Sequence, residues 1–137
     1  HPGGSLGRRL LLRVRDIMHS GERIPIVPKD ARLKQALLEM SKKGLGMTAI
    51  ADESNKLLGI YTDGDLRRTL DSNADIQTAM IRDHMTADCV TIDADLIASS
   101  ALTLMQNNAI NALIVTHKDG TIQGALNMHD LLRAGIV

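Results

Sequence analysis

Apolar positions along the chain follow two different periods, and their order predicts the secondary structure. Apolar residues spaced at i, i+3, i+4 and i+7 indicate one helix beginning near residue 30 and another near residue 95. Short apolar runs between polar turns indicate strands before and after each helix. The first half is expected to contain strands at 24–27, 47–51 and 57–61 and helices from 30 and at 63–70; the second half is expected to contain strands at 89–92, 112–116 and 121–126 and helices from 95 and at 128–134.

Polar residues mark the expected ends of the two longer helices. The carboxylates of Asp30 and Asp95 are placed to cap the first backbone N–H groups. Gly44 suits the left-handed conformation that ends a helix, and 107–108 (Asn-Asn) is expected to serve this purpose in the second half. Gly, Asn and Asp in the intervening turns favour hairpin connections.

The two halves are repeats of each other. A shift of 65 positions superposes the following pairs: Leu33 and Ala98, Ala36 and Ala101, Leu37 and Leu102, Met40 and Met105, Gly59 and Gly124, Asp65 and Asp130, and Arg68 and Arg133. Upstream, 16–18 matches 83–85 at a shift of 67. Because a unit of about 60 residues buries too little surface to be stable alone, we expect an α/β (α+β) fold of two pseudo-symmetric β-α-β-β-α units packed through their small sheets.

Composition narrows the class of partner. Sixteen Lys and Arg balance sixteen Asp and Glu, which disfavours nucleic acid as a partner. No apolar run approaches the ~18 residues of a membrane span, and nothing resembles a signal peptide, so we expect a cytoplasmic protein. The single cysteine, Cys89, excludes an internal disulfide. Cys89 is interpreted as a buried strand residue, with a reactive thiol as the alternative.

The turn after the second strand of each unit is the candidate site. Thr62 precedes Asp65 by three positions, and Asn127 precedes Asp130 in the same way, each at a strand-to-helix junction. This spacing predicts a capping box. The same junction exposes N–H groups that favour an anion, and its carboxylate can accept ribose hydroxyls. The preceding glycines leave room either for a ligand or for packing.

This doubled unit, with its Gly-x-x-Thr-x-x-Asp turn and the openings Asp16-Ile17-Met18 and Asp83-His84-Met85, resembles a CBS-domain pair. The resemblance implies CBS domains at 14–72 and 73–137, a nucleotide-binding cleft between them, and self-association as a dimer. It also implies that Thr62 and Asp65 contact ribose and phosphate in one site, and that Asn127 and Asp130 do so in the other. Asn127 departs from the usual Ser or Thr.

The flanks narrow the resemblance. The start, His1-Pro2-Gly3-Gly4, and the segments 59–68 and 128–135 resemble bacterial D-arabinose 5-phosphate isomerases, which act on the route to Kdo and lipopolysaccharide. This implies that 1–13 is a linker from an isomerase domain, that His1 occupies the family's active-site junction, and that the parent protein is a tetramer. We expect this fragment itself to be no enzyme, because no catalytic constellation stands out.

The resulting hypothesis is a regulatory module that binds CMP-Kdo, AMP or another adenine or cytidine nucleotide, with no required cofactor. The alternative is an oligomerisation module with no physiological ligand. Histidine spacing gives no reason to expect a metal site. Arg67 and Arg68 are expected on a solvated helix face, from which one could neutralise a ligand anion. Four further residues complete the candidate ligand-binding set: Met47, Thr91, His129 and Arg133.

Overall fold

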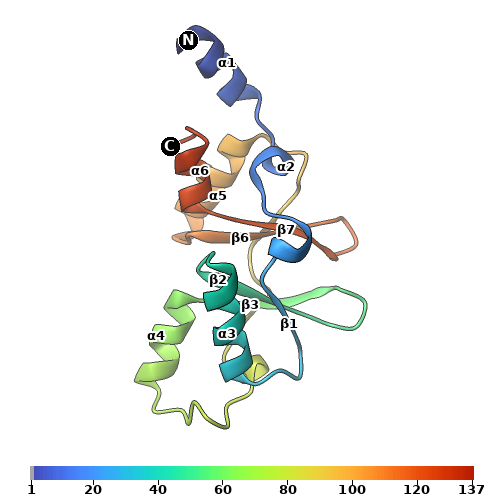
Figure 1. Cartoon of the computed structure of the whole chain (residues 1–137), viewed down its shortest axis with the longest axis vertical. Coiled ribbons are helices and arrows are strands. Elements are labelled where there is room, and N and C mark those ends of the chain that lie inside the picture. Colours follow the sequence, from blue (N-terminus) through green and yellow to red (C-terminus); the bar gives the residue numbers. More distant parts are fainter. Residues whose placement is uncertain (1) are drawn as a thin grey trace.

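Two small sheets stack on each other and carry helices on their outer faces (Figure 1). A computed structural model describes residues 2–137, with side chains described from residue 6 onward. The elements in chain order are α1 (Pro2–Leu11), α2 (Val14–Ile17), η1 (Gly21–Arg23), β1 (Ile26–Pro28), α3 (Leu33–Lys43), β2 (Met47–Ala51), β3 (Leu57–Thr62), α4 (Asp63–Asp71), η2 (Ile81–Asp83), β4 (Thr86–Ala87), β5 (Thr91–Ile92), α5 (Ala98–Asn108), β6 (Ala112–Thr116), β7 (Ile122–Asn127) and α6 (Met128–Arg133).

The two sheets have the same internal arrangement. In the first, with strand order β1-β2-β3-β4, β1 is parallel to β2 and β2 is antiparallel to β3. In the second, with order β5-β6-β7, β5 is parallel to β6 and β6 is antiparallel to β7. The β-α-β-β-α order expected from the sequence is therefore confirmed for both units.

The core between the sheets holds the units together. Met47, Ala49 and Ile60 of the first sheet belong to the same buried cluster as Ile114 and Ala125 of the second. Each sheet also has a second buried cluster on its outer side, between the sheet and its own helices. The expectation that the units pack through their sheets is confirmed, because neither sheet could bury its inner face alone.

The segment that opens each unit crosses to the sheet of the other. Strand β4, which follows Met85, pairs with β3 of the first sheet. In the matching place, His19 forms an antiparallel bridge with Ala125 of the second sheet, with backbone N–O distances of 2.8 and 3.0 Å. The segment that opens the first unit thus lies on the second sheet, and the segment that opens the second unit lies on the first sheet. The exact boundary between residues 72 and 73 stays a prediction.

These crossings explain the glycines near the candidate turns. A Cβ on Gly59 would lie 2.7 Å from Met85 Sδ. A Cβ on Gly124 would lie 2.5 Å from Met18 Sδ. Of the two interpretations left open by the sequence, the structure favours packing: each glycine gives room to the methionine of the crossing segment.

The predicted caps of the longer helices are wrong. Helix α3 begins at Leu33 and α5 at Ala98, so neither Asp30 nor Asp95 caps a helix. The crossing segments supply the missing hydrogen bonds, because Leu33 N–H donates to the carbonyl of residue 79 and Ala98 N–H donates to that of residue 12. Asp95 pairs instead with the guanidinium of Arg15.

The ends of these helices agree only in part with expectation. Gly44 is left-handed at the end of α3, with φ of 71°, as predicted. In the second unit 107–108 stays helical and Ala109 takes the left-handed conformation, with φ of 53°. The Asn108 side-chain amide donates to Leu104 O one turn back, which holds the residue in the helix.

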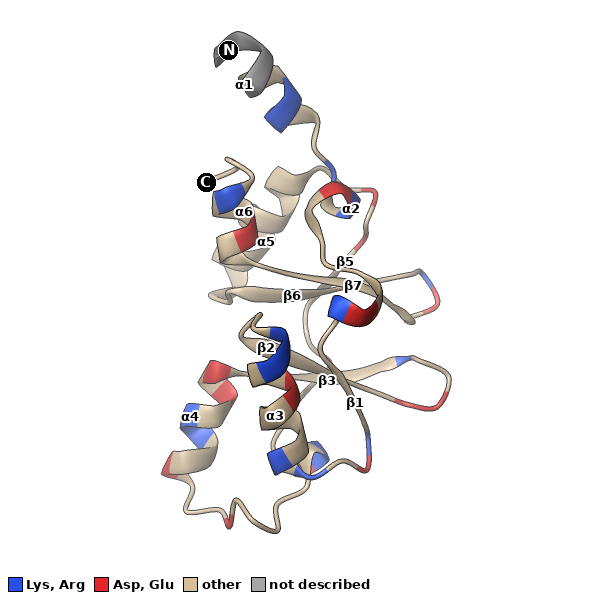
Figure 2. Ribbon diagram, in the orientation of Figure 1, with Lys and Arg blue, Asp and Glu red and all other residues tan. Residues whose placement is uncertain are grey.

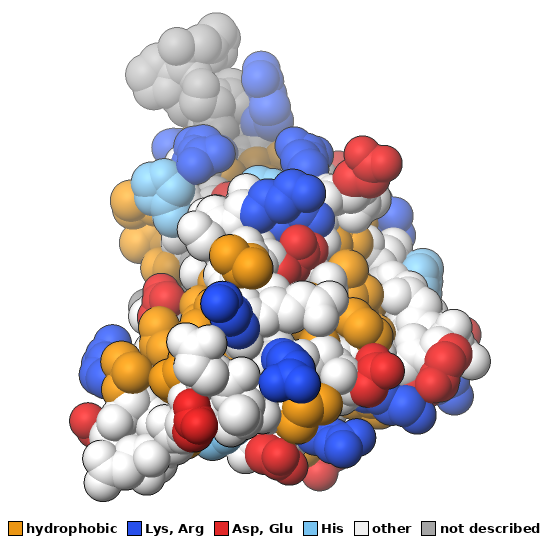
Figure 3. All heavy atoms as spheres, turned by 60° about the horizontal axis from the view of Figure 1, so that its bottom comes forward, with side chains coloured by type: hydrophobic (Ala, Val, Ile, Leu, Met, Phe, Trp, Pro, Cys, Tyr) orange, Lys and Arg blue, Asp and Glu red, His pale blue; other side chains and the backbone are white. Residues whose placement is uncertain are grey.

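Residues 1–13, expected as a linker, include helix α1, which extends away from the sheets (Figure 1). No helix in the described part of the chain is long and apolar enough to cross a membrane. Basic and acidic residues occur on both units in Figure 2 and are interspersed over the face seen in Figure 3, in keeping with their equal numbers.

Candidate functional site

The turn between β3 and α4 is a capping box. Thr62 N–H donates to Asp65 Oδ2 at 2.9 Å, and Asp65 N–H donates to Thr62 Oγ1 at 3.5 Å. The turn forms because an extended residue at the end of a buried strand is followed at once by helical residues, whose first N–H groups need acceptors. Asp65 is only 4% exposed, and its carboxylate accepts hydrogen bonds from Thr62, Arg68 and Thr86.

The turn between β7 and α6 repeats the capping box. Asn127 N–H donates to Asp130 Oδ2, and Asp130 N–H donates to Asn127 Oδ1, both at 2.9 Å. The Asn127 Nδ2 group donates in addition to Leu45 O of the first unit at 3.2 Å. Both ends of the Asn127 amide are therefore engaged, one in the cap and one in a link between the units.

The two turns border a cleft of about 770 Å³ between the units. The cleft opens where β3 and β7 end, and Figure 1 shows the two junctions on the same side of the molecule. Its lining comprises 45–46, 62–65, 67–68, 88–90, 109–112 and 127–129, together with Ile60 and Thr86. Such a concave site at a junction of two units, with both apolar and charged walls, is a usual place for a small-molecule ligand.

Charges of both signs face this cleft. Arg67 and Arg68 contribute guanidinium groups, while Asp63, Asp65 and Asp88 contribute carboxylates. Arg68 Nη2 donates to Asp65 Oδ1 at 2.7 Å, although 71% of the Arg68 side chain is exposed. Because the Arg68 side chain lies largely in solvent, its guanidinium can also turn toward an anion in the cleft. The arrangement suits a ligand that carries both hydroxyl groups and negative charge.

Some candidate residues line the cleft and others do not. Thr62, Asp65, Asn127 and His129 line it, and His129 is exposed there. Asp130 is 7% exposed and lies behind the lining. Their part in ligand binding stays a prediction.

The remaining candidates lie elsewhere. Met47 is fully buried in the core between the sheets and lines no part of this cleft, because β2 turns it inward. Thr91 and Arg133 are exposed and stand outside the lining. His1 lies outside the described residues.

Residues that local patterns had not singled out also border the cleft. Thr86 donates its hydroxyl to Asp65 Oδ1 at 2.8 Å from the crossing strand β4. The repeat could have pointed to Thr86, because this residue directly follows the Asp-x-Met opening of the second unit. Cys89 lies just before β5, half-buried in the cleft wall rather than within a strand. Burial raises the pKa of its thiol, which argues against a reactive thiolate.

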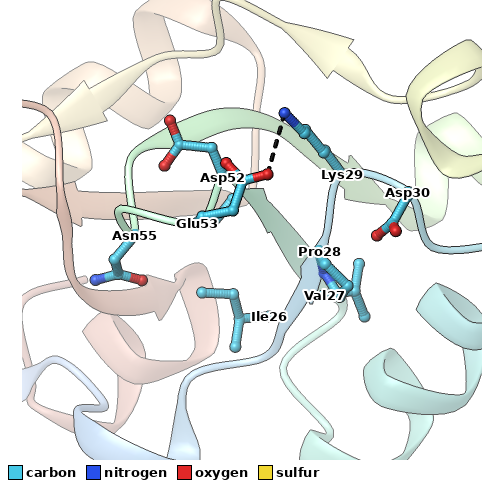
Figure 4. A pocket seen from close by; sticks show the side chains of 9 residues that line it. Ile26, Val27, Pro28, Lys29, Asp30, Asp52, Glu53 and Asn55 are labelled. Atoms are coloured by element: carbon cyan, nitrogen blue, oxygen red, sulfur yellow. Dashed lines mark ion pairs between the residues drawn. The ribbon is translucent and has the colours of Figure 1, made fainter.

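A second hollow lies at the end of β1 beside the β2–β3 loop (Figure 4). Its volume is about 420 Å³. Lys29 reaches across to Glu53, with an N–O distance of 3.2 Å, and the two side chains are 50% and 79% exposed. The lining of this hollow holds one lysine against three carboxylates, so it offers less to an anionic ligand than the cleft between the units. Among the described residues no group of His, Cys, Asp or Glu is arranged to hold a metal ion.

Two stacked sheets with exchanged opening segments, and a capped turn facing the cleft between them, define the class of this protein. The family model for the CBS domain matches residues 14–72 and 81–136, and the chain belongs to the CBS domain family. As the resemblance implied, it is a tandem CBS pair.

Among curated proteins the chain is similar to the arabinose 5-phosphate isomerase KdsD of Pseudomonas aeruginosa. The two are 53% identical over 137 residues, which is all of this chain and 42% of the relative. The KdsD of Escherichia coli strain K12 is 50% identical over the same length, again with 42% of the relative covered. The chain thus spans less than half of these relatives.

Solved structures share the fold at low sequence identity. One is the CBS domain pair of protein MJ0100 in complex with 5′-methylthioadenosine and S-adenosyl-L-methionine, with a TM-score of 0.80, 22% identity, and coverage of 90% of this chain and 94% of that one. Another is CBSX2 in complex with AMP, with a TM-score of 0.77, 21% identity, and coverage of 91% and 96%. CBS pairs of this shape thus include proteins in complex with AMP or with other adenosine derivatives.

Proposed function

We propose that this chain is the ligand-sensing part of an arabinose 5-phosphate isomerase and that it binds a nucleotide or nucleotide-sugar in the cleft between its units. The supporting observation is the position of Asp65, a buried carboxylate at the start of α4 that lines a cleft of about 770 Å³ beside Arg67 and Arg68. Isomerase activity belongs, in this proposal, to the part of the relatives that the chain does not span.

The chemistry of the cleft favours CMP-Kdo as the first ligand to test. A ribose offers hydroxyl groups that donate to the Asp65 carboxylate, as acidic residues bind ribose in other nucleotide sites. A phosphate and a sugar carboxylate offer anions that pair with Arg67 and Arg68. CMP-Kdo is also a logical effector, because it is a later product of the Kdo pathway in which the isomerase acts first. AMP, bound by CBSX2, is the simpler alternative ligand.

Regulation in this proposal follows from linkage. A ligand in the cleft contacts both units, so it favours one relative disposition of them over another. Such a ligand shifts the attached catalytic domains only as far as its affinity differs between the two dispositions.

Self-association is compatible with the same structure. Leu38 on α3, Leu70 on α4 and Leu132 on α6 are 65%, 61% and 55% exposed. Burying such side chains against a second copy is favourable. A dimer of this chain, a tetrameric parent and a cytoplasmic location remain proposals.

Calorimetric titration of the chain with CMP-Kdo, AMP, ATP and CMP tests ligand binding. We expect at least one to bind and Asp65→Asn to weaken it about tenfold or more, because hydrogen bonds to a charged group are worth about 1.5–3 kcal/mol. Asp71→Asn, at the exposed far end of the same helix, is the matched control and should bind as the original chain. Silence for all four ligands would leave the oligomerisation module as the better hypothesis.

The single cysteine gives an independent measurement. Because Cys89 lines the cleft, a bound ligand should slow its alkylation by a maleimide at pH 8. Equal alkylation rates with and without a ligand that binds by calorimetry would place the ligand outside this cleft.

A further inference from the structure

The aspartates of the two turns have different partners on the crossing segments. By the repeat, Asp65 corresponds to Asp130 and Thr86 corresponds to His19. Thr86 Oγ1 donates to Asp65 Oδ1 at 2.8 Å, whereas His19 Nε2 lies 2.9 Å from Asp130 Oδ1. A hydroxyl in one unit is thus replaced by an imidazole ring in the other.

The ring occupies the space in front of its aspartate. Thr86 is exposed, and it lines the cleft together with Asp65. The Asp65 and Asp130 side chains are equally buried, at 5% and 6% exposed. The difference lies in the group in front of each carboxylate, because the His19 ring is only 18% exposed and neither it nor Asp130 belongs to the cleft lining. A five-membered ring at hydrogen-bond distance from Oδ1 takes the place that a ligand hydroxyl would need.

The crossing segment fixes this ring in place. His19 is joined to Ala125 by backbone hydrogen bonds in both directions, at 2.8 and 3.0 Å. Met18, the residue before it, packs over Gly124. Freeing Asp130 for a ligand therefore requires the His19 ring to leave its partner while its backbone stays bound to the sheet.

Two further replacements remove ligand-binding groups from the second turn. Arg67, which lines the cleft, corresponds to Leu132, so a cation is lost. Thr62 corresponds to Asn127, whose amide is engaged at both ends by Asp130 and Leu45. Both replacements make the second turn a poorer site than the first for an anionic ligand with hydroxyl groups.

We propose that His19 takes the place of a ligand on Asp130, so that the chain binds one nucleotide, at the turn of Thr62 and Asp65, and the second site of the pair is closed from within. This inference rests on the proposed function, because it names which of the two turns takes the ligand. The residue that decides the number of sites is His19 in one unit and its counterpart Thr86 in the other.

A reciprocal exchange of these two side chains tests the proposal. Calorimetry with AMP and CMP-Kdo should give one equivalent bound per original chain. Thr86→His should weaken that binding about tenfold or more by placing a ring on Asp65. Ala87→His, which places the same ring on the neighbouring exposed residue of β4 outside the cleft lining, is the matched control and should keep it. His19→Thr should add a second, weaker event that disappears when Asp130→Asn is combined with it. Circular dichroism should show all variants folded.

The outcomes separate this inference from the proposed function. Two equivalents bound to the original chain, full binding by Thr86→His, or a single event in His19→Thr would each overturn the closed second site while leaving nucleotide binding intact. No binding of either nucleotide to the original chain would overturn both. One equivalent in the original chain, loss in Thr86→His and gain in His19→Thr support both.

Discussion

The contact between Gly124 and Met18 gives the sharpest test of the crossed segments. A Cβ added at Gly124 would lie 2.5 Å from Met18 Sδ, 3.0 Å from its Cγ and 3.0 Å from the backbone oxygen of His19. Non-bonded carbon atoms pack at about 3.5–4.0 Å, so the thioether must move by about 1 Å. Overpacking of this kind costs about 1–3 kcal/mol, and we expect Gly124→Ala to lower the free energy of unfolding by that amount.

The same geometry predicts strong coupling between the two positions. Met18→Ala removes the Sδ and Cγ contacts and leaves the contact with the His19 oxygen at 3.0 Å. In that background Gly124→Ala should cost less than about 1 kcal/mol, which makes the two substitutions non-additive by about 1–2 kcal/mol. Gly7→Ala is the control for the change of residue type: a Cβ at Gly7 meets nothing within 4 Å, and in a helix it should stabilise slightly, by about 0.5–1 kcal/mol.

Urea denaturation followed by circular dichroism measures all the variants, with midpoints compared at a common m-value. Additivity of Gly124→Ala and Met18→Ala to within about 0.5 kcal/mol would show that 14–20 does not lie on the second sheet. The crossing of the segments would then be wrong, and the pairing of His19 with Asp130 would fall with it.

Two further predictions concern stability. Burial raises the pKa of Glu39, but hydrogen bonds from Ile26 N–H and Lys43 lower it more, so the net pKa lies below its ordinary value. The ionised Glu39 therefore stabilises the fold above its ordinary pKa, and this contribution is lost as the pH falls through the pKa of the folded state. Glu39→Gln should lower the urea midpoint at pH 7, and the loss of unfolding free energy should become progressively smaller below about pH 4.5. A loss that grows on acidification would contradict this prediction. Leu126→Ala, at a fully buried position, should cost about 2–5 kcal/mol. Leu11→Ala, at a position 77% exposed, should change stability by less than about 0.5 kcal/mol, and equal costs would contradict the burial of β7.

The sequence by itself determined the features that neighbouring residues decide. The alternation of strands and helices follows from periodicity within a few residues, and the capping boxes of Thr62 with Asp65 and of Asn127 with Asp130 join residues three positions apart. The repeat predicted two similar units, and the need to cover two small sheets predicted that they pack together. These parts of the prediction are confirmed because their causes are local or are shared by both halves.

Tertiary structure decided what depends on the path of the chain. Helices α3 and α5 begin later than their expected caps because carbonyl groups from distant crossing segments accept their first hydrogen bonds. Met47 lies in the core instead of the cleft because the second sheet covers it. The partner of Asp130 is His19, 111 positions away in the sequence. A local pattern carries no information about such a pair, because only the packing of one unit on the other brings the two side chains together.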